Sequence, residues 1–207
     1  HRLDSTYLQI SPRIEIAHQT PNELRNYPSE FKVILLKSLT NAITLLHKNN
    51  IVHSDLKFDN ILIKKTKTNM PVAKIIDFDG SYFTKRPHLP EYMHFDQSYM
   101  APELLDSSLK SPAADMFSFG IMMWEIMFNE PPPHDGEEWH NFRSDRVPRP
   151  NKSRSDELFS LICKLLSADP SKRPTSRQVL TIPRVQAAMQ ETNSFITKKI
   201  LDNFDIE

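Results

Sequence analysis

One short stretch constrains the fold of this chain more than any other: His53–Asn60 reads His-Ser-Asp-Leu-Lys-Phe-Asp-Asn. It places a carboxylate at Asp55, a cation at Lys57 and an amide at Asn60 on one loop. Phosphoryl transfer needs a base that orients a hydroxyl nucleophile, a cation near the transferring phosphate, and ligands for magnesium. Asp55 can accept the hydroxyl proton, Lys57 can neutralise charge on a γ-phosphate, and the Asn60 amide oxygen can bind Mg²⁺. The stretch therefore predicts a phosphoryl-transfer loop with these three catalytic residues.

A second carboxylate follows the next predicted strands. Asp77 comes seventeen residues after Asn60, directly behind an apolar segment, and precedes Phe78. We expect Asn60 and Asp77 to bind magnesium, and both of them with Lys57 to contact ATP. The bare pattern Asp-x-Lys-x-x-Asn would be weak evidence, because a surface loop of ordinary charges can contain it. The flanking strands and the later Ala101-Pro102-Glu103 make the signal specific.

Hydrophobic periodicity predicts a mainly α chain with short β-hairpins. Apolar residues recur at three- and four-residue steps over Phe31–Leu46, which indicates an amphipathic helix ending near Asn49-Asn50. Residues 61–63 and 72–76 are predicted to be paired strands. Residues 113–128 are apolar nearly all round, which is typical of a helix buried on most faces.

Other segments give weaker signals. Leu158–Leu166 predicts another amphipathic helix, and Thr175 with Gln178 resembles a capping box that opens a further helix. The histidines outside the loop, His47 among them, show no metal-ligand spacing, so we expect surface or partly packed rings. The remaining predictions are a short strand at 6–11, a helical turn at 22–26, and long loops at 77–103 and 130–154.

Composition narrows the class of function. The 26 basic and 26 acidic residues cancel, so nothing suggests an electrostatic grip on nucleic acid or anionic lipid. The single cysteine, Cys163, fits a reducing compartment and is expected to be a buried structural thiol. No stretch approaches the roughly 18 apolar residues of a membrane span. We therefore expect an intracellular protein, nuclear or cytoplasmic, with no nucleic-acid partner and no membrane segment in this chain.

Together these motifs resemble the C-terminal lobe of a eukaryotic protein kinase, over nearly all residues from 6 to 187. The resemblance implies a protein substrate, ATP and Mg²⁺, and supporting roles for five further residues. His53 and Phe78 match the hydrophobic column that aligns the catalytic loop, and Asp115 matches the aspartate that holds the loop's backbone. Glu103 and Arg173 match a buried ion pair beneath the substrate loop.

Two departures from the common kinase pattern resemble one family in particular. Ser54 stands where an arginine is usual, and Asp96 stands where a threonine is usual. Both agree with the Wee/Myt family, the inhibitory kinases of cyclin-dependent kinases. Pro133–Arg149 is similar to that family's loop after the buried helix, because its Gly, Trp, Arg and Pro recur at the same spacing. The resemblance implies inhibitory phosphorylation of a cyclin-dependent kinase in its Gly-rich loop, on tyrosine alone or on tyrosine and the adjacent threonine, controlling mitotic entry.

Further departures bear on activity. Because Ser54 offers no guanidinium to an activation-loop phosphate, we predict activity that does not depend on such phosphorylation. Asp79 stands where kinases have the glycine of Asp-Phe-Gly, a residue that adopts backbone conformations closed to most others. Phe95 stands where a second glycine is usual. The sequence shows no Gly-rich loop, third-strand lysine or glutamate helix, the parts that hold ATP phosphates.

The predicted organisation follows from these motifs. We expect the last strand and hinge region of an N-terminal lobe at 1–27, a kinase C-terminal lobe at 28–187 and a tail at 188–207. The N-terminal lobe is then largely missing. The first residues, His1-Arg2-Leu3-Asp4, form neither a signal peptide nor an initiating methionine, so we expect the chain to begin inside a longer protein.

Two hypotheses of different classes remain open. The first is an active protein kinase, Wee/Myt-like and specific for tyrosine or both residue types, whose N-terminal lobe lies outside these residues. The retained acidic, basic and amide site residues favour it. The second is a half-kinase or pseudokinase, a binding module that regulates another kinase without catalysis. The missing lobe and Asp79 favour this alternative, and by either hypothesis the chain alone is expected to be inactive.

Overall fold

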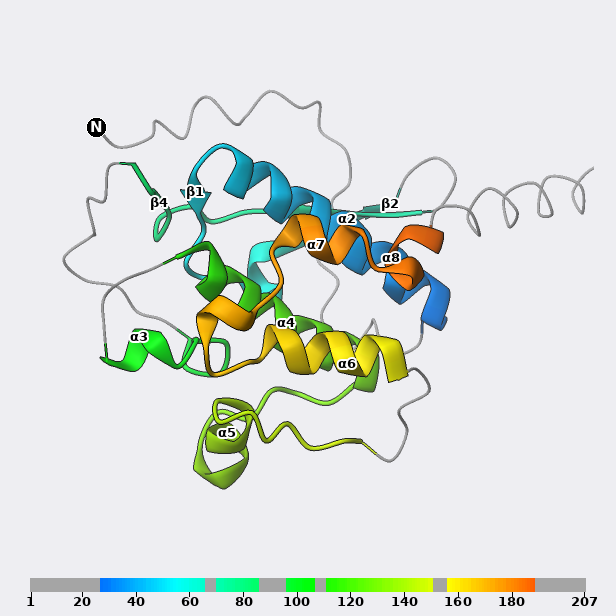
Figure 1. The fold of residues 1–207 in the computed structure, drawn as a ribbon. Helices are drawn as coiled ribbons and strands as arrows, with labels where there is room; N and C mark the ends of the chain where they lie inside the picture. Colours follow the sequence, from blue (N-terminus) through cyan, green and yellow to red (C-terminus); the bar gives the residue numbers. More distant parts are fainter. Residues whose placement is uncertain (1–26, 66–69, 86–95, 107–110, 151–155, 189–207) are drawn as a thin grey trace, which may run out of the picture.

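The computed structural model describes residues 27–65, 70–85, 96–106, 111–150 and 156–188. This part of the chain is mainly helical and carries two small antiparallel sheets, which confirms the predicted fold class (Figure 1). The strand predicted at 6–11 and the helical turn at 22–26 lie outside the described residues. The boundaries at 27 and 187 between lobe, hinge and tail stay a prediction.

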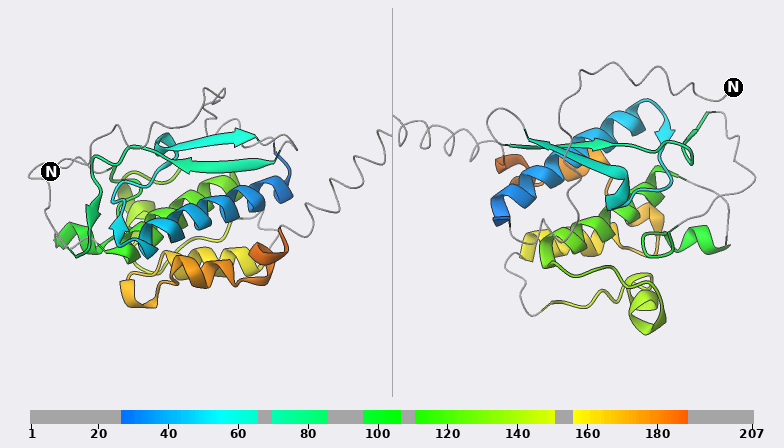
Figure 2. Two further views of the ribbon diagram at one scale, coloured as in Figure 1. Left: turned by 90° about the horizontal axis from the view of Figure 1, so that it is seen from above. Right: turned by 180° about the vertical axis from the view of Figure 1, so that it is seen from behind.

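Helix α2, Ser29–Lys48, confirms the amphipathic helix predicted from Phe31 onward. Its apolar stripe is buried, with Val33, Leu36 and Ile43 almost fully covered. The helix contacts β3 on one side and α7 and α8 on another, so it lies between the β-hairpin and the last helices (Figure 2, left). An apolar stripe facing both layers explains why the helix forms here.

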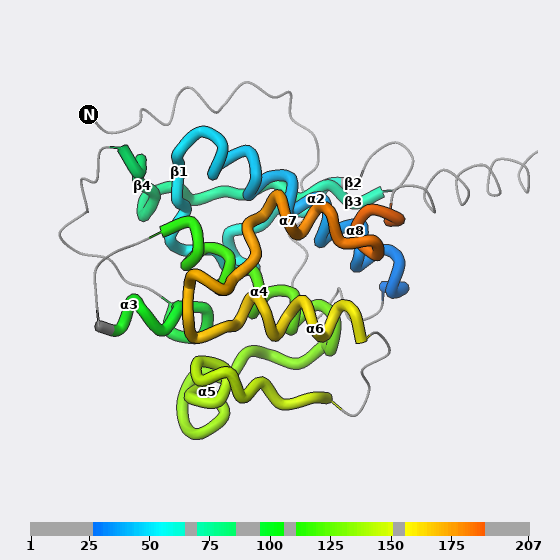
Figure 3. Tube along the Cα trace, in the orientation of Figure 1, coloured from blue at the N-terminus to red at the C-terminus, as the bar shows by residue number. Residues whose placement is uncertain are grey.

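Helix α4, Pro112–Phe128, confirms the predicted buried helix. Pro112 occupies its first turn, where the missing N–H costs nothing, and Asn129 caps its end in the left-handed conformation. Gly120 allows α4 to approach α6, Asp156–Leu165, because a Cβ there would lie 2.8 Å from the Leu165 Cβ. The tube in Figure 3 shows the two helices side by side beneath α2 and α7.

Two sheets flank the predicted catalytic loop. Strands β2, Ile61–Lys65, and β3, Pro71–Ile75, form an antiparallel hairpin with Ile61 opposite Ile75, which confirms the predicted strand pair. Strands β1, Ile51–Val52, and β4, Tyr82–Phe83, pair on the other side of the loop. The backbone N–H of Ala73 donates to Ser38 Oγ at 2.9 Å, which ties the hairpin to α2.

The two long loops predicted at 77–103 and 130–154 were wrong in part. The first contains β4, which has only two residues and therefore shows no alternation that sequence reasoning could detect. The second contains α5, Gly136–Phe142, a seven-residue helix with a mostly polar sequence and no repeating apolar face. Helix α3, Glu103–Asp106, begins at the last residue of the first predicted loop.

The C-terminal part closes the helical layer. Thr175 and Gln178 form the predicted capping box at the start of α7, Ser176–Leu180. Cys163 on α6 is half-buried rather than fully buried, and this burial raises the pKa of its thiol. The remaining short elements are the 3-10 helices η2, Phe58–Asn60, and η3, Pro170–Lys172, and the helix α8, Pro183–Ala187.

Candidate active site

The β2–β3 hairpin brings Asn60 and Asp77 to one end of the sheet. Ile61 pairs with Ile75, and the backbone N–H of Ile76 continues the ladder by donating to the Asn60 carbonyl at 2.9 Å. Asn60 therefore directly precedes β2 where Asp77 follows β3. Asn60 and Asp77 are seventeen residues apart in sequence but lie at the same end of the hairpin, because the chain folds back on itself.

Within the loop, three predicted catalytic side chains touch one another. The Asn60 side-chain nitrogen donates to the Asp55 carbonyl at 2.8 Å and to Asp55 Oδ2 at 3.0 Å. Lys57 Nζ lies 3.3 Å from the same Asp55 oxygen, and both charged side chains keep about a fifth of their surface exposed. The Asp55 carboxylate is thus fixed from two sides, and the Asn60 amide oxygen is left for another partner.

Asp115 supports the loop from below. It lies in the first turn of α4 with 1% of its surface exposed, where the helix dipole favours a carboxylate. Its oxygens accept the backbone N–H groups of His53 and Ser54, both at 2.9 Å. Ser54 has φ +73°, a region that disfavours non-glycine residues, so the bond to Asp115 holds a strained turn in place.

His47 is a further contact of Asp115 that the sequence did not reveal. Its Nε2 lies 3.0 Å from Asp115 Oδ2, although 68 residues separate the two in sequence. The expectation of a surface or partly packed ring agrees with its partial burial. No spacing signal could have found this contact, because α2 and α4 meet only in the folded chain.

His53 and Phe78 lie edge to face, with ring centroids 5.1 Å apart. The His53 ring also hydrogen-bonds the Ile76 carbonyl at 3.0 Å, so it connects the catalytic loop to the chain just before Asp77. The left-handed backbone in this stretch belongs to Asp77, at φ +60°, and Asp79 adopts no positive φ. The replacement of glycine by Asp79 therefore introduces no left-handed strain in this conformation.

Glu103 and Arg173 form the expected ion pair. The two terminal nitrogens of the Arg173 guanidinium bind the two oxygens of the Glu103 carboxylate at 2.7 Å, in the bidentate geometry that arginine favours. Arg173 also donates to the carbonyls of Ser167 and Ala113, at 2.8 and 2.9 Å. The pair links the start of α3 to the start of α4 and to the turn after α6.

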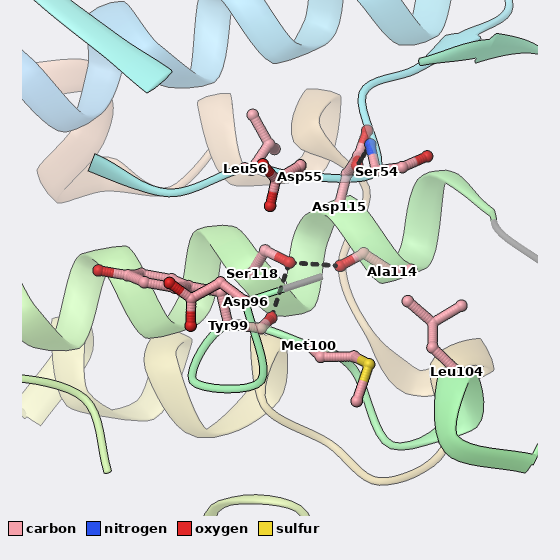
Figure 4. Close-up of a pocket in the computed structure, with 10 residues that line it drawn as sticks. All are labelled: Ser54, Asp55, Leu56, Asp96, Tyr99, Met100, Leu104, Ala114, Asp115 and Ser118. Carbon is pink, nitrogen blue, oxygen red and sulfur yellow. Dashed lines mark hydrogen bonds between the residues drawn. The ribbon is translucent and has the colours of Figure 1, made fainter. Parts of the chain in front are cut away.

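A small pocket lies between the catalytic loop, α4 and the segment 96–100 (Figure 4). Ser118 on α4 donates from its hydroxyl to the Tyr99 carbonyl at 2.8 Å, which fixes that segment against the helix. Tyr99 in turn donates to Glu125 at 2.7 Å, and burial is the main cause that raises the pKa of its hydroxyl. The lining residues are Ser54, Asp55, Leu56, Asp96, Tyr99, Met100, Leu104, Ala114, Asp115 and Ser118.

Comparison with known proteins identifies the family to which this arrangement belongs. A family described as "Protein kinase domain" matches residues 17–184, more than half of the chain. This chain belongs to the protein kinase domain family. It is 31% identical, over 96% of its length, to the membrane-associated tyrosine- and threonine-specific cdc2-inhibitory kinase of Drosophila melanogaster. It is 31% identical over 76% of its length to the corresponding wee-1.3 kinase of Caenorhabditis elegans.

The kinase domain is also 30% identical, over 71% of the chain, to Wee1-like protein kinase 1-B of Xenopus laevis. The matches span 37%, 23% and 27% of those three relatives, so the chain corresponds to less than two fifths of the length of each. The resemblance to the Wee/Myt family, stated above from motifs alone, is therefore confirmed at modest identity. No helix within the described ranges is long and apolar enough to span a bilayer.

The oxygen donors of the kinase domain fit a magnesium ion. The Asn60 amide is oriented with its nitrogen on Asp55, and Asp77 is an exposed carboxylate at the same end of the hairpin. Mg²⁺ prefers one or two protein oxygens together with phosphate oxygens and waters, so two donors suffice. In the part of the chain that the structure describes, no cluster of three or more His, Cys, Asp or Glu could hold a metal.

Proposed function

We propose that the protein containing this chain transfers the γ-phosphate of ATP to a hydroxyl of another protein. The observation that carries the proposal is the fixed Asp55 carboxylate, which Asn60 and Lys57 hold at 3.0 and 3.3 Å. A base held in one orientation is what phosphoryl transfer asks of a kinase catalytic loop.

Each residue has a distinct role in this proposal. Asp55 accepts the proton of the substrate hydroxyl as that oxygen becomes the nucleophile. Lys57, beside it, neutralises charge on the transferring phosphate. Asn60 and Asp77 hold magnesium, which supplies charge neutralisation for the phosphates of ATP when bound. His53, Phe78 and Asp115 act through these residues by fixing the loop.

We further propose that the substrate is a cyclin-dependent kinase, inhibited by phosphorylation on tyrosine, alone or together with the adjacent threonine. Support comes from two relatives, which are cdc2-inhibitory kinases specific for tyrosine and threonine. Ser54 and Asp96, the two departures from the common kinase pattern, point to the same family. Lys57 alone would have indicated serine or threonine as the acceptor.

The decisive experiment compares the full-length protein with its Asp55→Asn variant on a cyclin-dependent kinase and Mg-ATP. We expect the variant to lose activity by about 100-fold or more, because the proton acceptor is removed while the side chain keeps its shape. Glu157→Gln is the matched control, since it also removes one carboxylate charge but lies exposed on α6. Circular dichroism and thermal unfolding establish that all three proteins are folded.

Unchanged phosphorylation by Asp55→Asn at matched folding would sink the enzyme proposal. A full-length protein that binds a partner kinase but phosphorylates nothing would favour the binding module instead. The substrate proposal fails separately if phosphoamino-acid analysis finds modified serine or threonine in peptides and never the tyrosine of a cyclin-dependent kinase.

A further inference from the structure

Two side chains at the C-terminal half of helix α5 bind the backbone of a segment distant in sequence. Trp139 lies in the helix and Arg143 is its C-cap residue, four positions later, so the two side chains lie on the same side. The Arg143 guanidinium lies 3.9 Å from the centroid of the Trp139 ring, and it also donates to the Trp139 carbonyl at 3.1 Å. The two side chains therefore form one stacked unit. Helix α5 lies at the edge of the described fold (Figure 1).

This unit binds the backbone of residues 97–100. Trp139 Nε1 donates to the Gln97 carbonyl at 2.9 Å, and Arg143 Nη2 donates to the same oxygen at 2.7 Å. Arg143 also reaches the carbonyls of Ser98 and Met100, at 3.1 and 3.0 Å. The fourth carbonyl of the stretch, at Tyr99, accepts from Ser118. Side chains thus satisfy every carbonyl of a segment that has no regular secondary structure.

The same segment forms one wall of the pocket beside Asp55. Tyr99 and Met100 line that pocket together with Asp55 and Leu56 of the catalytic loop (Figure 4). The wall is held by α4, through Ser118 and Glu125. It is also held by Trp139 and Arg143, so its position beside Asp55 depends in part on these two side chains. A protein segment that presents its hydroxyl to Asp55 from this pocket would lie against this wall.

The hydrogen bonds of Arg143 among the described residues all go to backbone carbonyls, and its guanidinium also stacks on the Trp139 ring. Its surface is 5% exposed, and burial lowers the pKa of its guanidinium to about 10, so it stays cationic at neutral pH. Among the described residues it makes no ion pair with a carboxylate. The cation therefore binds three carbonyls of the segment at once. These bonds hold the segment without a phosphate group.

We propose that Trp139 and Arg143 are positioning residues that clamp residues 97–100 in the substrate-binding arrangement without activation-loop phosphorylation. The proposal rests on the proposed kinase function for its effect on substrate. Its structural half, the clamp itself, stands without that function. The two halves are tested by separate measurements on the same variants.

The experiment uses the full-length protein with Trp139→Phe, Arg143→Lys and the control Glu138→Gln. Phenylalanine keeps a ring for stacking but lacks the indole N–H, and lysine keeps the charge but cannot reach three carbonyls together. Glu138 is exposed on the same helix and has no contact with residues 97–100 among the described bonds. Hydrogen exchange is followed at the amides of Ser98 and Tyr99. These amides donate to the side-chain and backbone oxygens of Asp96, both at 3.0 Å, and are therefore protected while the segment keeps this turn.

We expect exchange at these amides to accelerate about threefold in Trp139→Phe and about tenfold in Arg143→Lys, with no change in Glu138→Gln. We also expect the KM for the protein substrate to rise in the same order, while the KM for ATP stays unchanged. If the two residues had a purely structural role, their variants would lose thermal stability, but the KM for protein substrate would not rise selectively over the KM for ATP.

Exchange that is unchanged in both variants overturns the clamp, whatever the activity. Faster exchange with an unchanged KM for protein substrate overturns the positioning role. If Arg143→Lys fails to fold, Trp139→Phe decides alone, because Trp139 is only partly buried and phenylalanine keeps an aromatic ring. If the wild-type protein phosphorylates nothing, the exchange measurement still decides the clamp, and only the proposed function has failed.

Discussion

Two buried arginines lie near the ring of Phe117, and they make opposite use of the same guanidinium group. The Arg143 guanidinium carbon lies 5.4 Å from the ring centroid and that of Arg173 lies 5.0 Å from it. Each arginine is 5% exposed. Arg173 binds a carboxylate with both of its terminal nitrogens, whereas the hydrogen bonds of Arg143 within the described residues go only to backbone carbonyls.

The difference separates stability from positioning. Losing Arg173 leaves the Glu103 carboxylate in a poorly solvated place without its cation, so the cost falls on the whole fold. Losing Arg143 leaves only neutral carbonyls, and the Gln97 end of their segment is exposed to water. The carbonyls there can exchange a lost donor for solvent. The cost should therefore stay local, in the segment beside Asp55.

The largest expected effect tests the paired arginine. Arg173→Met should lower the free energy of unfolding by about 3 kcal/mol, the lower end of the range for breaking a buried pair, because the Glu103 side chain keeps 18% exposure. Urea unfolding followed by circular dichroism measures the change. A loss below 1 kcal/mol would break the comparison, since Arg173 would then matter no more than a surface residue.

A second variant identifies the cause of that loss. If the carboxylate that has lost its arginine is responsible, the double variant Glu103→Gln with Arg173→Met should be more stable than Arg173→Met alone, by about 1–2 kcal/mol. A double variant that is less stable would assign the loss to the carbonyl contacts of Arg173 with Ser167 and Ala113 instead.

The next effect tests the unpaired arginine. Arg143→Met should lower the free energy of unfolding by only about 1–2 kcal/mol, because three carbonyls lose a donor while the desolvation cost of a buried cation disappears. The same urea titration measures it beside Arg173→Met. Equal losses in the two variants would show that a carboxylate partner makes no difference, and the comparison would fail.

Much of the fold and the loop could be predicted from sequence because the relevant contacts are short in range. Asp55, Lys57 and Asn60 lie within six residues, and a single hairpin brings Asp77 to them. The long helices α2 and α4 show apolar patterns over many turns, which periodicity detects well.

The contacts that sequence reasoning missed are long in range and directed at backbone atoms. Arg143 reaches carbonyls 43 to 46 residues away, and a carbonyl has no side-chain identity to predict. In the sequence, Trp139 and Arg143 stand out only by a family-like spacing, which indicates no role for either side chain. Helix α5 and strand β4 are too short to show a period, so the elements that position these residues were assigned to loops.

The smallest expected effect concerns phosphorylation, and it sharpens the comparison further. Ser54 donates its backbone N–H to Asp115 and carries no cation, so the loop has nothing at that position to receive a phosphate. Arg143 already holds residues 97–100. Phosphatase treatment of the full-length protein should therefore leave kcat/KM for the protein substrate unchanged within assay error, in the wild type and in the control Glu138→Gln.

The measurement pairs mass spectrometry of residues 80–100 with the kinase assay before and after treatment. A large drop in activity, reversed by rephosphorylation within that range, would mean that a phosphate and not Arg143 orders the segment. The variant Trp139→Phe makes the test stricter. If phosphorylation restores its KM for substrate while leaving the wild type unaffected, clamp and phosphate are interchangeable ways of fixing the same wall. If it does not, the chain has come to rely on the unpaired arginine alone.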